Sequence, residues 1–321
     1  GLSEGERVKF VRTLLVGASN IVEELVNLAK KSLERKRARD NPLTSPEIAS
    51  IVHVNYAEGC CEADQQLSSR QALHLGADET RPLNGTFLSD DFLRDFGHLL
   101  KFTRSETMMQ HKTPSGGYLV WKPYIILKTL LDEALPWDTT AILYADAGIR
   151  FVAPFSNIVR RLLEFTDVAA VRTPMPEGGF SKRDAFVLLD MDTQTVMESK
   201  QIAAGLIILR KTKLAVQFLE SWLEACKDKR IITEEPSILG RPEHFLFRNN
   251  NDDQTAFSLL FKKFGFRAFS EAVRDSFADI ARNRLKLEHA TNDFALGRNV
   301  DRTAYLKFAD EAAAAALSSE T

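Results

Sequence analysis

The chain has 321 residues, of which 44% are hydrophobic and 27% charged, an ordinary composition for a globular protein. Its 42 basic and 44 acidic residues leave a net charge of -2, so a general affinity for nucleic acid is not indicated and any anion site must be local. The three cysteines lack zinc-site spacing, which favours a reducing, cytoplasmic compartment. The sequence has no run of eighteen apolar residues that would predict a transmembrane segment.

The first 47 residues form an expected amino-terminal helix and linker. Apolar residues recur at helical spacing through 6–36, and residues 30–40 (KKSLERKRARD) are strongly basic. These cations suit the carboxyl end of a helix dipole, and they would also allow peripheral contact with the cytoplasmic face of a membrane. Two prolines in 40–47 then end the helix.

Short apolar runs alternate with amphipathic stretches through residues 48–285, which we take as one domain. The pattern is typical of an α/β fold: a mostly parallel, Rossmann-like sheet flanked by helices. Residues 286–321 form a carboxyl-terminal extension that ends in a helix or a frayed tail. The expected strands are 48–56, 79–83, 140–151, 167–174 and 199–212. The expected helices are 63–77, a helix from Trp121, 155–165, 214–228 and 252–266.

Three residues fall at expected strand ends: Asn55, Asp146 and Gly205. Ligands of open α/β sheets bind outside the carboxyl ends of the strands, so we expect these residues to share one crevice. A carboxylate such as Asp146 can hold Mg²⁺ or Mn²⁺ there, and Gly148 beside it leaves room for a ligand. The alternative role for Asp146 is to cap the turn after the strand.

The sequence has no dinucleotide, P-loop, nucleophile-elbow or zinc-protease motif. Within residues 48–270, an ordered set of segments resembles nucleotide-diphosphosugar transferases of the GT-A fold. The set is IVHVNYAEGC, HLGADE, GGYLVWKPYIILKTL, ILYADAG, KRDAF, QIAAGLIILRKT, ESWLEACKD and NDDQTAFSLL. It is similar to a group with a G-Y-x-x-W-K-P helix and a Y-x-D-A-G strand. The resemblance implies a glycosyltransferase that moves a sugar from a UDP- or GDP-sugar to a hydroxyl of a glycan or other acceptor.

The resemblance also assigns a metal position. Asp146 matches the first aspartate of the family's metal-binding D-x-D element, but Gly148 stands where the second aspartate usually lies. One carboxylate binds a divalent ion less tightly than two. Two alternatives follow: a cofactor of Mn²⁺ or Mg²⁺ held through Asp146, or a metal-independent variant that uses basic residues.

Other donor contacts are expected near the same strand ends. Lys122 follows a Gly-Gly turn at a helix start and would meet phosphate, or merely pack with its neighbours. Tyr56 would stack on a nucleobase, or be simply half-buried. By the resemblance, Asp184 meets the donor sugar from a mobile loop after Gly178-Gly179, with a solvated charged loop as the alternative. The expected donor-binding set is Asn55, Tyr56, Lys122, Asp146, Gly148, Lys182 and Arg183.

The second half of the sheet would receive the acceptor. Small residues at Ala204 and Gly205 would let a sugar approach the backbone, and Gln201 would hydrogen-bond to it. At a predicted helix start, Asp253 with Gln254 would serve as general base or orient the donor, unless the aspartate is only an N-cap. The candidate catalytic residues are Asp253, Gln254 and Asp184.

Some candidates rank lower. Asp190 and Asp192 form a second D-x-D-like pair. His111 and His244 are expected to be structural or exposed, and His244 and His289 are kept as remote metal candidates. A nucleotidyltransferase is not favoured, because its glycine- and arginine-rich loop is absent. The competing hypothesis is a non-catalytic scaffold of the same fold that binds a nucleotide or a sugar.

Overall fold

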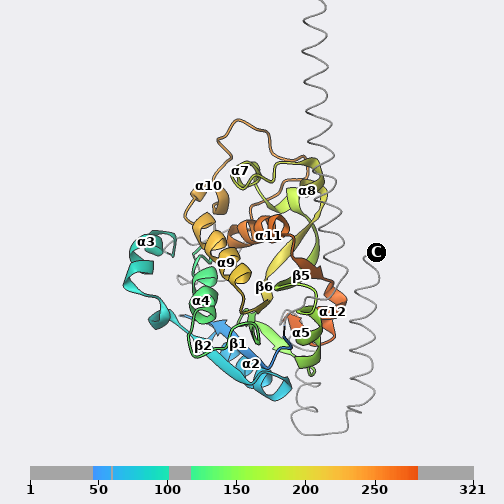
Figure 1. Cartoon of the computed structure of the whole chain (residues 1–321). Helices are drawn as coiled ribbons and strands as arrows, with labels where there is room; N and C mark the ends of the chain where they lie inside the picture. The colour runs from blue at the N-terminus through green and yellow to red at the C-terminus, as the bar shows by residue number, and fades with distance from the viewer. Residues whose placement is uncertain (1–45, 59–60, 101–116, 281–321) are drawn as a thin grey trace, which may run out of the picture. The chain divides into compact units, whose positions relative to one another are not determined.

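A computed structural model describes most of the central part of the chain (Figure 1). The described residues are 46–58, 61–100 and 117–280. Several expectations lie outside them, namely the helix over 6–36, the basic segment 30–40, the extension 286–321, His111 and His289. Within the described part, no helix has the length and apolar character needed to cross a membrane.

The central sheet has six strands in the order β2-β1-β3-β6-β5-β7. β1, β2 and β3 are mutually parallel, as are β5 and β7, whereas β6 runs antiparallel to both of its neighbours, β3 and β5. The expected α/β class with a mostly parallel sheet is confirmed, and the reversed direction of β6 is a feature that the sequence did not predict. The strands are β1 (Ser50–Tyr56), β2 (Glu79–Leu83), β3 (Thr140–Ala145), β5 (Val168–Pro176), β6 (Lys200–Arg210) and β7 (Arg267–Phe269).

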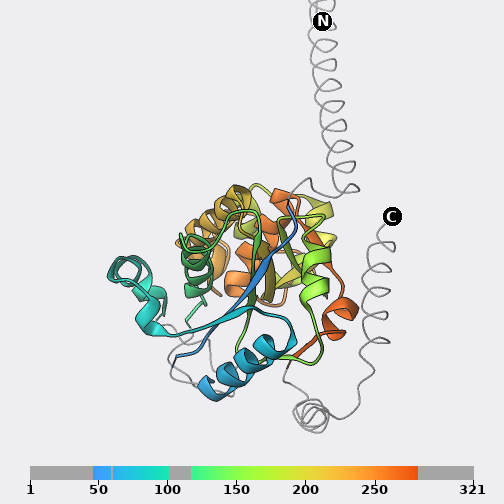
Figure 2. The same cartoon turned by 60° about the horizontal axis from the view of Figure 1, so that its bottom comes forward.

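Helices cover both faces of this sheet. Successive strand residues project from opposite faces, and each face has its own cluster of buried hydrophobic side chains. Ile142 and Tyr144 of β3 belong to one cluster, and Ala141 and Leu143 to the other. The first cluster packs under α3 (Asp90–Leu100), α4 (Trp121–Leu130), α9 (Lys213–Ala225) and α11 (Asp252–Phe264). The second packs under α2 (Glu62–Leu75), the blue helix at the bottom of Figure 2, α5 (Ser156–Leu162) and α12 (Glu271–Asp275).

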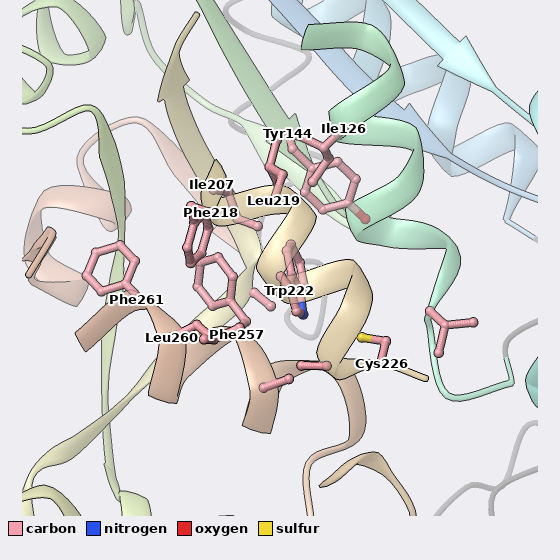
Figure 3. Close-up of a cluster of buried hydrophobic side chains, with 14 of the residues drawn as sticks. Ile126, Tyr144, Ile207, Phe218, Leu219, Trp222, Cys226, Phe257, Leu260 and Phe261 are labelled. Carbon is pink, nitrogen blue, oxygen red and sulfur yellow. The ribbon is translucent and has the colours of Figure 1, made fainter. Parts of the chain in front are cut away.

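Trp222 belongs to the first cluster and forms a hydrogen bond with the first turn of α11. Figure 3 shows Trp222 and Phe218 of α9 packed against Phe257 of α11. The Trp222 and Phe257 ring centroids are 4.8 Å apart, and the Trp222 side chain is fully buried. Its Nε1 donates a hydrogen bond of 2.9 Å to the backbone oxygen of Asp253. The core therefore fixes the position of the first turn of α11.

The expected strand over 140–151 is interrupted, and this corrects the prediction. β3 ends at Ala145, and the backbone oxygen of Asp146 accepts a hydrogen bond of 2.8 Å from Ile149 N, which closes a turn. Ile149–Phe151 forms β4, which pairs with β8 (Ala278–Ile280) in a separate two-stranded sheet. The turn therefore places Asp146 at the carboxyl end of a central strand.

The Gly178-Gly179 turn expected before a mobile loop is instead part of a helix, so that prediction was wrong. Gly178 and Gly179 belong to α6 (Glu177–Phe180) and are buried. A Cβ on Gly178 would lie 2.8 Å from Cγ of His244, which shows how tightly this turn is packed. The remaining short elements are η1 (Gly85–Phe87), α7 (Arg183–Leu188), α8 (Gln194–Glu198) and α10 (Lys229–Ile232).

Candidate functional site

Asp146 is a half-exposed carboxylate at the end of β3, with 47% of its side chain accessible. Its Oδ1 accepts a hydrogen bond of 2.6 Å from the Tyr144 hydroxyl and lies 3.3 Å from Nζ of Lys122. Its backbone N–H donates to the oxygen of Gly205 at 2.8 Å. One carboxylate oxygen is therefore held from inside the protein, while the side chain remains accessible to solvent.

Lys122 is buried between two carboxylates. Its side chain is 3% exposed, and Nζ lies 3.3 Å from Asp146 Oδ1 and 3.3 Å from Asp253 Oδ2. Burial by itself would lower the pKa of Lys122, but the negative charges of Asp146 and Asp253 outweigh it and raise that pKa. The residue is therefore a charged ammonium, and it links α4 to both β3 and α11.

Tyr144 completes this group from inside the sheet. Its side chain is fully buried, and burial first, then the charge of Asp146, raises the pKa of Tyr144 well above its ordinary value. The phenol therefore stays protonated and acts as a donor to Asp146. Sequence reasoning missed Tyr144, although residues two apart on a strand project from the same face.

Two glycines lie close to Asp146, but their surroundings differ. A Cβ added to Gly205 would lie 2.9 Å from Asp146 Oδ2, whereas a Cβ added to Gly148 would find no described atom within 4 Å. Gly205 is thus needed to leave space for Oδ2. The space beside Gly148 is open, as the sequence led us to expect.

We predict that Gly205→Ala weakens ligand binding at Asp146 by about tenfold, because Oδ1 is pinned and the carboxylate cannot turn away freely. The free energy of unfolding should change little. Gly97→Ala on α3 is the matched control, because a Cβ added there would find no described atom within 4 Å, and it should keep the wild-type affinity. Isothermal titration with the ligand of the site would compare the two variants, and equal affinities would contradict the crowding argument.

Asp253 and Gln254 begin α11 and join it to neighbouring elements. The Asp253 side chain is 2% exposed and is held against Lys122. Gln254 accepts a hydrogen bond of 3.1 Å from the backbone N–H of Ala204 and donates one of 2.8 Å to Oε1 of Gln201. Gln201 is fully buried. These expected catalytic and acceptor residues therefore lie next to Asp146, Lys122 and Tyr144. Their hydrogen bonds connect α11 to β6.

Asn55 and Tyr56 lie at the end of β1 but face inward. Asn55 is fully buried and donates hydrogen bonds of 3.1 Å to α2, at the oxygen of Gln65 and the hydroxyl of Ser69. The Tyr56 ring stacks on Trp121 with centroids 4.1 Å apart. Of the three residues expected at strand ends in one crevice, Asp146 does contact Gly205, but Gly205 lies in the middle of β6 and not at its end, and Asn55 is packed against a helix.

Lys182, Arg183 and Asp184 all hold the segment 229–243. The Lys182 ammonium donates to the backbone oxygens of Lys229 and Glu235, and burial lowers the pKa of Lys182. The Asp184 carboxylate is fully buried and accepts hydrogen bonds from the N–H groups of Ile238 and Leu239. The backbone N–H of Arg183 donates a hydrogen bond of 2.8 Å to the Glu243 carboxylate, and its guanidinium pairs with Asp192 at 2.9 Å. Their observed contacts are therefore with this segment rather than with Asp146.

The lower-ranked metal candidates are dispersed. Asp192 also pairs with Arg241 at 3.0 Å, and the Asp190 side chain is 95% exposed, 3.9 Å from Lys263. His244 packs its ring on Gly178. In the described part of the chain, no three residues of the His, Cys, Asp and Glu types form a group that could hold a metal ion. A divalent ion at Asp146 would therefore need ligands other than a cluster of protein side chains.

Backbone strain occurs close to the Lys122–Asp253 pair. Leu119, three residues before Lys122, has φ 55°, and Asp252, adjacent to Asp253, has φ 47°. Non-glycine residues rarely adopt this left-handed region, and such residues cluster at functional sites. Leu119 lies just before α4, which carries Lys122, and Asp252 is the first residue of α11, which carries Asp253.

No protein-family model matches the chain, and no curated protein matches it. Among solved structures, it is similar to mouse xyloside xylosyltransferase 1, at 12% identity and a TM-score of 0.35 over 67% of this chain and 81% of that one. It is also similar to the bifunctional glycosyltransferase WbbM, at 12% identity and a TM-score of 0.37 over 69% and 39% of the two chains. The galactosyltransferase LgtC matches at 11% identity and a TM-score of 0.36 over 65% and 70%. All three of these neighbours are glycosyltransferases.

Proposed function

We propose that this chain is a glycosyltransferase of the GT-A type that binds a UDP- or GDP-sugar with its diphosphate beside Asp146. The observation that carries the proposal is the half-exposed Asp146 carboxylate at the carboxyl end of β3, where ligands of α/β sheets bind. A buried lysine and a buried tyrosine hold it in place.

The charge at the site indicates what accompanies the donor. Asp146, Asp253 and Lys122 sum to a formal charge of −1, so a diphosphate placed beside them needs another cation. Mg²⁺ and ions like it are often bound by one or two carboxylates together with substrate phosphates, and the single accessible carboxylate of Asp146 fits that arrangement. The proposed cofactor is therefore Mn²⁺ or Mg²⁺, held by Asp146 and the donor. When bound, the ion would neutralise charge on the departing diphosphate.

In the proposed reaction, an acceptor hydroxyl oxygen forms a bond to the anomeric carbon of the donor sugar. The bond from that carbon to the diphosphate oxygen breaks, and the hydroxyl proton passes to the released diphosphate or to water. Gly205 of β6 offers a backbone surface next to Asp146 for the sugar, whereas the neighbouring Ala204 is buried. Gln254, fixed by its bonds to β6, keeps that surface in place.

One observation favours the competing hypothesis of a non-catalytic binding scaffold. Asp253, Asp184 and Gln201 are all buried, and each holds neighbouring parts of the protein. In this arrangement no expected base faces an acceptor. Such a scaffold would bind the nucleotide sugar without releasing the nucleoside diphosphate.

A release assay separates the two functions. We expect the protein, mixed with UDP- and GDP-sugars and Mn²⁺, to liberate free UDP or GDP faster than a blank without protein. Asp146→Ala should reduce the rate to that of the blank. Binding of a nucleotide sugar without any release would support the scaffold, and the absence of both would refute the proposed donor class.

A further inference from the structure

The charged atoms of Asp253, Lys122 and Asp146 form a continuous chain from the core to the surface. They come from α11, α4 and β3, and each contact along the chain measures 3.3 Å. Exposure rises sharply at its end, from 2% for Asp253 and 3% for Lys122 to 47% for Asp146. The first two members are thus anchored, and only the third can reach a ligand.

We propose that Lys122 is a positioning residue, which holds Oδ1 of Asp146 so that Oδ2 is presented to the cation and diphosphate of the donor. This inference rests on the proposed function. It differs from the direct phosphate contact expected from the sequence, because the Lys122 ammonium is buried and already neutralised by two carboxylates. Lys122 acts on the donor through Asp146.

The surroundings of Asp146 determine which oxygen is presented. Lys122 and Tyr144 both contact Oδ1, while Oδ2 is the atom nearest to a Cβ built on Gly205. An exposed aspartate normally samples several rotamers, and ordering it costs conformational entropy on binding. Two donors on one oxygen remove that freedom before the ligand arrives, which is the general benefit of preorganisation.

The anchor is rigid at its inner end. The backbone oxygen of Asp253 is bonded to Trp222, whose ring is fully buried among aromatic residues. Leu119 and Asp252, with their left-handed backbone, set the starts of the two helices that carry the pair. A buried ion pair is a poor device for stability alone, because apolar residues of similar volume often replace it without loss. The contact between Lys122 and the half-exposed Asp146 is therefore not explained by a contribution to stability.

This distinction gives a test with two readouts, melting temperature and affinity for UDP or GDP with Mn²⁺. Lys122→Met should lower both, because it leaves the Asp253 charge buried without its cation. The double variant Lys122→Met/Asp253→Leu removes that charge, so its melting temperature should return toward the wild-type value. Its nucleotide affinity should nevertheless remain at least about tenfold weaker, because Asp146 is still not held.

Lys128→Met is the matched control, since Lys128 lies on α4 but is exposed and bonds to the oxygen of Phe87. It should match the wild type in affinity. Wild-type affinity in the double variant would overturn the inference and reduce Lys122 to a partner of Asp253, with the proposed function intact. If the wild-type protein itself binds neither nucleotide, the proposed function fails first.

Discussion

Asp146→Ala is expected to reduce affinity for UDP or GDP in the presence of Mn²⁺ by about 100-fold, equivalent to about 2.7 kcal/mol of binding free energy. The reason is that Asp146 is the accessible carboxylate of a group whose other members are buried. Without it, the cation that offsets the diphosphate charge loses its proposed protein ligand. Isothermal titration of the variant beside the wild type measures the loss directly.

The same titration tests the rival D-x-D pair. Asp190→Ala removes a carboxylate whose side chain is 95% exposed and which lies 3.9 Å from Lys263. We expect this variant to bind as the wild type does. A loss of affinity in Asp190→Ala with full binding in Asp146→Ala would move the donor site to the other pair.

Trp222→Ala is expected to lower the free energy of unfolding by about 3–5 kcal/mol, the usual cost of removing a large aromatic ring from a core. Trp222 is fully buried and contacts the rings of Phe218 and Phe257. The substitution also removes the donor to the backbone oxygen of Asp253, at the first turn of α11. Urea unfolding, followed by circular dichroism in the far ultraviolet so that the signal does not depend on tryptophan fluorescence, would measure the change in the free energy of unfolding.

Trp222→Phe separates packing from the hydrogen bond. It keeps an aromatic ring but leaves the Asp253 oxygen without its donor, for which we expect a cost of about 1–2 kcal/mol. Equal stability of the alanine and phenylalanine variants would show that ring packing contributes little. A negligible effect in both would contradict the role of Trp222 in fixing α11.

Much of the sheet could be predicted because its strands are short, apolar and separated by clear turn residues. The runs IASIVHVNY and SKQIAAGLIILRKT became β1 and β6, and NDDQTAFSLLFKKFGF became α11. The direction of β6 could not be predicted, since an apolar run reads the same for parallel and antiparallel pairing. Helix α3 was missed although Phe92, Phe96 and Leu99 recur at helical spacing and are buried.

Prediction of the site was uneven for a physical reason. A motif identifies residue types near a strand end, but it does not tell which way each side chain projects. Asp146 and Gly205 are in contact. The side chains of Asn55 and Asp184 instead form hydrogen bonds with other parts of the protein interior. Lys122 was expected to contact phosphate, but its ammonium lies between Asp146 and Asp253. These two aspartates are 24 and 131 positions after Lys122 in the sequence. Only the tertiary structure could show these contacts.

The most direct test of the account is to titrate the wild-type protein with UDP and with GDP, each in Mn²⁺ and in EDTA. We predict that at least one nucleotide binds in Mn²⁺ and that the binding falls at least about tenfold in EDTA, because the group around Asp146 has a net negative charge. Binding of neither nucleotide under either condition would contradict the proposal that Asp146 faces the diphosphate of an activated sugar.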